Sequence, residues 1–140
     1  MKIANDRTLR DLQDDFKKVF PYLKIEFYKS SHQYGEETIL EAPLNPDLLV
    51  GEVRALNNYG IITLDGNQKT SELESICAKL YELNVQVFRK SYGKWLQTWA
   101  TDNWTLQEQN DRSAKMGDKS FEKSDQKDRK RQDKIFSTTL

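Results

Sequence analysis

The chain lacks most of the residues and segments that would point to an oxidising compartment, a membrane or a catalytic centre. It has one cysteine, Cys77, which excludes an intramolecular disulfide and favours a reducing compartment. No apolar run approaches the roughly 20 residues that cross a bilayer, and the first residues lack an apolar stretch of signal-peptide length. We therefore expect a cytoplasmic protein that does not engage a membrane.

Neither sign of charge is in excess, since 22 basic residues balance 22 acidic ones. This balance gives no broad electrostatic reason to expect binding to nucleic acid. Residues 1–110 carry 13 basic and 16 acidic side chains, whereas residues 111–140 carry 9 and 6 and have few large apolar groups. Such a polar segment cannot bury enough surface to offset its ordering entropy. The composition predicts a folded domain over 1–110 and a disordered, charged tail over 111–140.

No catalytic or metal-binding motif is present. His32, the single histidine, has no second histidine or cysteine near it, and Cys77 lies on an apolar helix face where a buried hydrophobe is expected. Glu36, Glu37 and Glu41 are acidic but lack the Asx and glycine pattern of a calcium loop. The isolated turn glycines form no phosphate cradle. We expect no cofactor, no metal and no enzymatic activity.

Two segments have the 3.6-residue periodicity of amphipathic helices. Residues 8–20 place Leu9, Leu12 and Phe16 on one face and charged residues on the other, and residues 70–82 repeat this arrangement. Three pairs stand at capping-box spacing: Thr8 with Asp11, Ser71 with Glu74, and Thr105 with Glu108.

Alternating or β-branched segments predict strands at residues 22–29, 61–64, 85–90 and 94–100. The turn at 91–93 joins the last two strands into a hairpin, because its glycine lets a short loop close. Residues 30–58 are less clear. They hold a short strand at 38–40 and then either a short helix capped by Asp47 or a strand at 48–53.

Together these elements predict an α+β fold. It is a small single domain of two helix-to-strand units and a C-terminal β-hairpin, with the helices on one face of the sheet. The two units resemble each other, since Asp11-Leu12 corresponds to Glu72-Leu73 and Phe16 to Cys77. This match indicates an internal repeat or a chance similarity.

All three tryptophans lie within residues 83–109, on and after the hairpin. A one-residue slip exchanges the two faces of a strand, so two registers are open for the last strand. Either Leu96 and Ala100 face the helices while Trp95 and Trp99 lie on the opposite face, or the reverse holds. We favour the first register because Leu96 and Ala100 suit packing against helices.

In that register an exposed aromatic patch forms, edged by lysines. Its members are Tyr28, Phe88, Trp95, Trp99, Lys24, Lys90 and Lys94. Aromatic side chains dominate many protein interfaces, so the leading hypothesis is a non-enzymatic module for a protein partner or a homodimer. The alternative is single-stranded nucleic-acid binding through the same face with Arg89, which the acidic excess of residues 1–110 disfavours. A third interpretation is that the Trp104 segment or residues 31–58 pack against this face and bury it.

The chain resembles a group of small uncharacterised bacterial proteins of the Bacteroidetes type. The runs that carry this resemblance are Phe20–Phe27, Val85–Ser91, Trp95-Leu96 and Thr101–Asn110. It covers most of residues 8–110 and excludes the tail. The resemblance implies a bacterial cytoplasmic setting, and it supplies no activity and no site residues.

Overall fold

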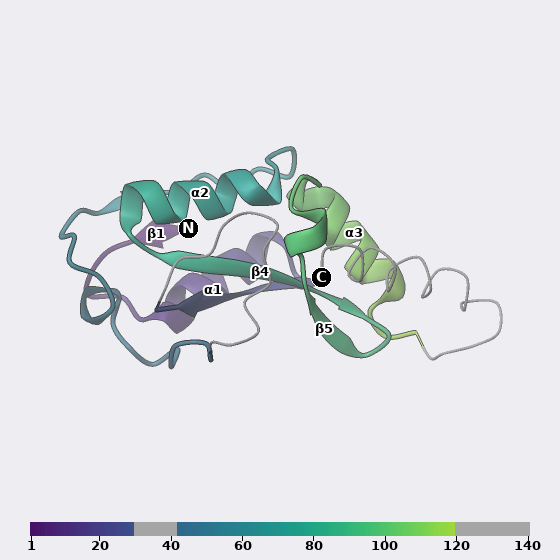
Figure 1. The fold of residues 1–140 in the computed structure, drawn as a ribbon, viewed down its shortest axis with the longest axis horizontal. Coiled ribbons are helices and arrows are strands. Elements are labelled where there is room, and N and C mark those ends of the chain that lie inside the picture. Colours follow the sequence, from purple (N-terminus) through teal and green to yellow (C-terminus); the bar gives the residue numbers. More distant parts are fainter. Residues whose placement is uncertain (30–41, 120–140) are drawn as a thin grey trace.

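The computed structural model describes residues 1–29 and 42–119 (Figure 1). In chain order the elements are β1 (Lys2–Ile3), α1 (Leu9–Val19), β2 (Leu23–Tyr28), the 3-10 helix η1 (Val50–Glu52), β3 (Gly60–Ile61), α2 (Thr70–Tyr81), β4 (Asn84–Ser91), β5 (Lys94–Gln97), the 3-10 helix η2 (Trp99–Thr101) and α3 (Leu106–Met116). The predicted α+β class is confirmed.

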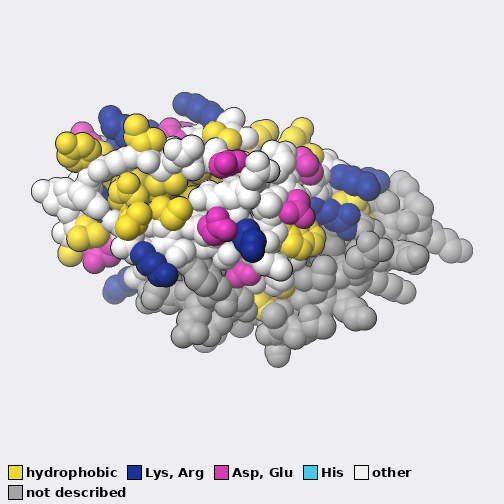
Figure 2. Space-filling model, turned by 90° about the horizontal axis from the view of Figure 1, so that it is seen from above, with side chains coloured by type: hydrophobic (Ala, Val, Ile, Leu, Met, Phe, Trp, Pro, Cys, Tyr) yellow, Lys and Arg dark blue, Asp and Glu magenta, His cyan; other side chains and the backbone are white. Residues whose placement is uncertain are grey.

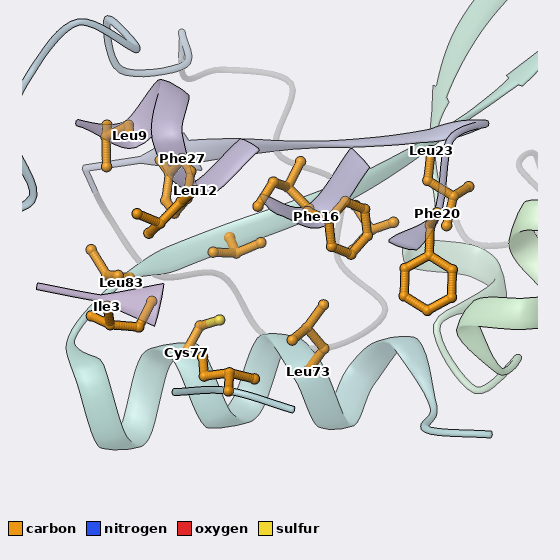
Figure 3. Packing of buried hydrophobic residues seen from close by; sticks show 14 of the residues in the cluster. Ile3, Leu9, Leu12, Phe16, Phe20, Leu23, Phe27, Leu73, Cys77 and Leu83 are labelled. Atoms are coloured by element: carbon orange, nitrogen blue, oxygen red, sulfur yellow. The ribbon is translucent and has the colours of Figure 1, made fainter. Parts of the chain in front are cut away.

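Two antiparallel sheets organise the chain. One is three-stranded in the order β2-β4-β5, and the other pairs β1 with β3. The buried apolar side chains of α1, α2, β2 and β4 form one cluster, and Figure 3 shows Leu12 and Phe16 of α1 directed toward Leu73 and Cys77 of α2. Burying an apolar side chain of this size contributes about 1.5–3 kcal/mol, so this cluster is the main source of stability.

The N-terminus of α1 is hydrogen-bonded to the N-terminus of η1. The amide of Leu9 donates to the carbonyl of Leu48 over 3.0 Å, and the amide of Val50 donates to the carbonyl of Arg7 over 2.8 Å. The next amide of each helix bonds across in the same way, Arg10 to Pro46 and Gly51 to Asn5.

The N-termini of α2 and α3 repeat this arrangement. Thr70 N donates to Trp104 O and Leu106 N to Gln68 O, each over 2.9 Å. One residue further on, Ser71 N donates to Asp102 O and Gln107 N to Gly66 O. Amides in the first turn of a helix have no partner within the helix. In each pair, the carbonyls just before one helix therefore accept hydrogen bonds from the first two amides of the other helix.

Two of the three predicted capping boxes are confirmed. The hydroxyl of Thr8 accepts from the amide of Asp11, and that of Thr105 accepts from the amide of Glu108. The Ser71–Glu74 box is wrong because α2 begins at Thr70. Ser71 is thus already inside the helix, where its amide bonds to α3 instead of needing a cap.

Other boundaries also differ from the sequence-based expectation. The expected domain end at residue 110 falls inside α3, which continues to Met116 and buries Ser113 and Met116 against the domain. The segment near Asp47 forms η1 in place of a longer helix or a strand, and the last strand ends at Gln97 in place of residue 100. The predicted strand at 38–40 and residues 120–140 of the predicted tail lie outside the described residues.

The side-chain caps predict a contrast between two substitutions at helix starts. Thr8→Ala removes the acceptor for the Asp11 amide and should cost about 1 kcal/mol of unfolding free energy. Ser71→Ala removes no cap and should cost less than about 0.5 kcal/mol. Urea denaturation of both variants followed by circular dichroism measures the difference. Equal losses would contradict the assignment of the caps.

Candidate functional site

The register of the three-stranded sheet decides which side chains share a face. Ile25 pairs with Val87 on the face that carries the core, so the alternate residues Lys24 and Phe88, which also pair, lie on the opposite face. In β5, Trp95 pairs with Lys90 and therefore joins them. The predicted register of Trp95 is confirmed.

Three lysine ammonium groups surround the ring of Trp95. Lys24 Nζ lies 4.8 Å from the ring centroid, Lys17 Nζ lies 5.9 Å away and Lys90 Nζ lies 6.0 Å away. Lys24 Nζ also lies 5.3 Å from the ring of Phe88. At these distances each ammonium is attracted to the negative face of the aromatic ring. The side chain of Trp95 remains 36% exposed.

A pocket of about 190 Å³ opens beside this ring, between α1, β4, β5 and the end of α3. Tyr22, itself half exposed, lines the pocket together with Lys17, Lys90 and Trp95. We name the set of six side chains the basic aromatic cluster: Lys17, Tyr22, Lys24, Phe88, Lys90 and Trp95.

Helix α3 holds the backbone beneath the cluster in place. The hydroxyl of Ser113 accepts from the amide of Lys90 over 2.8 Å and donates to the carbonyl of Tyr22 over 2.6 Å. The side-chain oxygen of Asn110 accepts from the amide of Tyr22 over 3.0 Å. One helical face thus fixes two strands that contribute members of the cluster.

The cluster has an excess of positive charge. Lys24 lies 3.5 Å from Glu26 and Lys90 lies 3.1 Å from Asp118, both at the surface, where such pairs contribute about 0–1 kcal/mol. Among residues 1–29 and 42–119, no carboxylate lies within ion-pair distance of Lys17. The arrangement can therefore accept an additional anionic group.

Two of the predicted patch residues are buried. β5 ends at Gln97, and the chain turns at Thr98 into η2, where the amide of Thr101 donates to the carbonyl of Thr98. Trp99 therefore leaves the strand and is only 4% exposed. Tyr28 lies at the far end of β2 opposite Asn84 and is buried as well. The prediction that these two rings are exposed was wrong.

The remaining predicted residues divide between two locations. Lys94 is exposed beside the hairpin turn and stays outside the cluster. Arg89, named for the nucleic-acid alternative, faces the core side and is buried, with its guanidinium 5.1 Å from the ring of Trp104. Arg89 therefore does not belong to the exposed face.

Sequence reasoning missed two members of the cluster. Tyr22 precedes Lys24 by two residues, so the alternation of the strand could have placed both on one face. Lys17 belongs to a different element, α1, and only the tertiary arrangement brings it to Trp95. No sequence signal identified that contact.

The buried titratable groups of α2 have their pKa values raised by burial. Burial raises the pKa of Glu74 to about 8, and the negative charge of Asp102 adds to this rise. The hydrogen bond that Val87 N donates to the Glu74 carboxyl acts in the opposite direction. Burial, with the charge of Glu74, raises the pKa of the Cys77 thiol to about 12. Cys77 is thus a protonated core residue and not an activated nucleophile.

Other candidate groups give no further site. No cluster of three or more metal-ligating side chains occurs within the described part of the chain. His32, Glu36, Glu37 and Glu41 lie outside it. No helix in 1–29 or 42–119 has the length and apolar character needed to cross a membrane.

A scan against protein-family models gives no match, and searches of curated proteins and of solved structures give none either.

The difference in burial between Trp99 and Trp95 predicts a large loss of stability for one substitution and a small loss for the other. Trp99→Ala should cost about 3–5 kcal/mol of unfolding free energy because it empties a packed site. Trp95→Ala should cost less than about 1 kcal/mol, since its ring lies at the surface. Chemical denaturation measures both. A large loss for Trp95→Ala would make that ring a structural residue.

Glu74 predicts a specific dependence of stability on pH. The pKa of its carboxyl is about 4.5 in the unfolded chain, and burial raises this pKa to about 8 in the folded protein. Stability should therefore fall as pH rises through that interval, by up to about 1.4 kcal/mol per pH unit, and level off above it. In Glu74→Gln this fall should be absent. The exposed helix residue Glu72 supplies the control, Glu72→Gln, which should keep the wild-type dependence. Urea denaturation across the interval tests this, and an unchanged profile in Glu74→Gln would refute it.

Proposed function

We propose that the protein is a non-enzymatic interaction module that binds an acidic segment of a partner protein through the basic aromatic cluster. The observation that carries this proposal is the placement of three ammonium groups within 6.0 Å of one exposed tryptophan ring. Exposed tryptophan and tyrosine side chains supply much of the binding energy at protein interfaces. Lysines around them supply attraction for carboxylates and steer the encounter.

The cluster is held ready for binding. Because Ser113 and Asn110 fix the backbone at Tyr22 and Lys90, little main-chain ordering is needed when a partner docks. Lys17 supports the choice of an acidic partner, since it has no carboxylate at ion-pair distance among the described residues. A partner carboxylate can pair with Lys17 and can replace the exposed Asp118 at Lys90, while an apolar side chain contacts Trp95.

A protein partner is favoured over single-stranded nucleic acid. Base stacking needs an open ring face, and here the protein's own lysines lie over Trp95 and Phe88. We place the interaction in a reducing cytoplasm, where the free, buried Cys77 is stable.

A synthetic peptide of glutamate and phenylalanine tests the proposal by isothermal titration calorimetry at low salt. Binding should be lost at high salt, and Lys17→Glu should weaken it by about tenfold or more, equivalent to about 1.4 kcal/mol. Lys18→Glu, the neighbouring change outside the cluster, is the matched control and should retain affinity within about twofold.

A second titration distinguishes a protein partner from single-stranded nucleic acid. Oligothymidine is titrated under the same conditions, and we expect weaker binding than for the peptide. Tighter binding of oligothymidine that depends on Trp95 would favour the nucleic-acid alternative. Peptide binding that is equally strong in Lys17→Glu and Trp95→Ala would exclude the cluster as the binding surface.

A further inference from the structure

A second surface, formed by α2 and β3, exposes large apolar side chains. Leu80 is 59% exposed, Ile61 74% and Tyr59 82%. Figure 2, seen from the α2 side, shows hydrophobic side chains gathered over one end of the molecule, where Figure 1 places the C-terminal end of α2. We call Tyr59, Ile61, Ile76 and Leu80 the α2 patch. It shares no residue with the basic aromatic cluster.

Specific contacts hold the two parts of this patch together. The side-chain amide of Asn58 donates to the carbonyl of Leu80 over 2.8 Å. Gly60 lies so close to the phenol oxygen of Tyr81 that a Cβ atom at this position would clash with it. The backbone of residues 58–60 is therefore held beside the last turn of α2, so Tyr59 and Ile61 extend from a position next to Leu80.

A shallow groove of about 320 Å³ continues from the patch along α2. Its lining has an acidic residue, Glu72, near one end and a basic residue, Lys79, near the other, with Ser75 and Ile76 between them. The two charges are separated by two helical turns, and the small Ser75 at the midpoint permits another helix to approach closely.

The arrangement of Glu72 and Lys79 along α2 is complementary to that of a second, antiparallel copy of α2. When two copies of α2 pack antiparallel about a two-fold axis near Ser75 and Ile76, Glu72 of each copy faces Lys79 of the other. A parallel arrangement would instead bring like charges together. The zero formal net charge of the chain adds no long-range repulsion between copies.

We propose that the α2 patch and its groove bind a second copy of this chain in an antiparallel α2–α2 contact, with Leu80 and Ile61 as apolar anchors. This proposal is independent of the function proposed for the basic aromatic cluster.

Sedimentation velocity of the full chain, from about 1 µM to about 1 mM, tests the contact. Wild-type protein should shift from monomer to dimer across this range. Leu80→Glu should remain monomeric, whereas Val19→Glu, an exposed apolar position on α1, should dimerise like wild type. A monomer at all concentrations, or dimerisation that survives Leu80→Glu, would overturn the proposal.

A charge exchange tests the antiparallel geometry with surface substitutions that leave the core intact. Glu72→Lys and Lys79→Glu each place like charges opposite one another twice, so each variant alone should dimerise about tenfold more weakly. The double variant restores both opposite-charge pairs and should dimerise as wild type does. A double variant as weak as the single ones would exclude this pairing.

Discussion

The reciprocal hydrogen bonds between helix N-termini are the constraint on which the arrangement of the elements depends. A helix start buried in a small domain needs partners for its first free amides. Here α1 and η1 supply each other's partners, and α2 and α3 do the same through Thr70 and Leu106. Because each bond fixes both position and direction, these four helices are arranged as two pairs.

The pairing of α2 with α3 leads directly to the candidate site. With its first turn fixed to α2, α3 crosses the end of the sheet and places Ser113 between Tyr22 and Lys90. In the segment between β5 and α3, Trp99 lies in η2 and is buried, while Trp95 on β5 stays at the surface. One tryptophan thus stabilises the core and another is available for contact.

Local patterns in the sequence predicted most of the elements. The periodicity of residues 70–82 and the alternation of residues 22–29 reflect faces that are buried in the fold. The register of Trp95 was predicted by assigning Leu96 to the core side, and the pairing of Leu96 with Arg89 places it there. The burial of Trp99 could not be predicted in this way, because the alternation of residues 94–100 gives no signal that the chain turns into η2 at Thr98. The contact of Lys17 with Trp95 likewise depends on the tertiary arrangement.

The paired helix starts also change which parts of the chain open first. Helix ends ordinarily fray, and their amides exchange hydrogen with solvent faster than those in the middle. In this protein the first amides of α2 and α3 are bonded to each other's preceding loops, so neither start can open alone. Their exchange reports the separation of the two helices as one cooperative unit, which makes these amides natural probes of whether α3 stays docked.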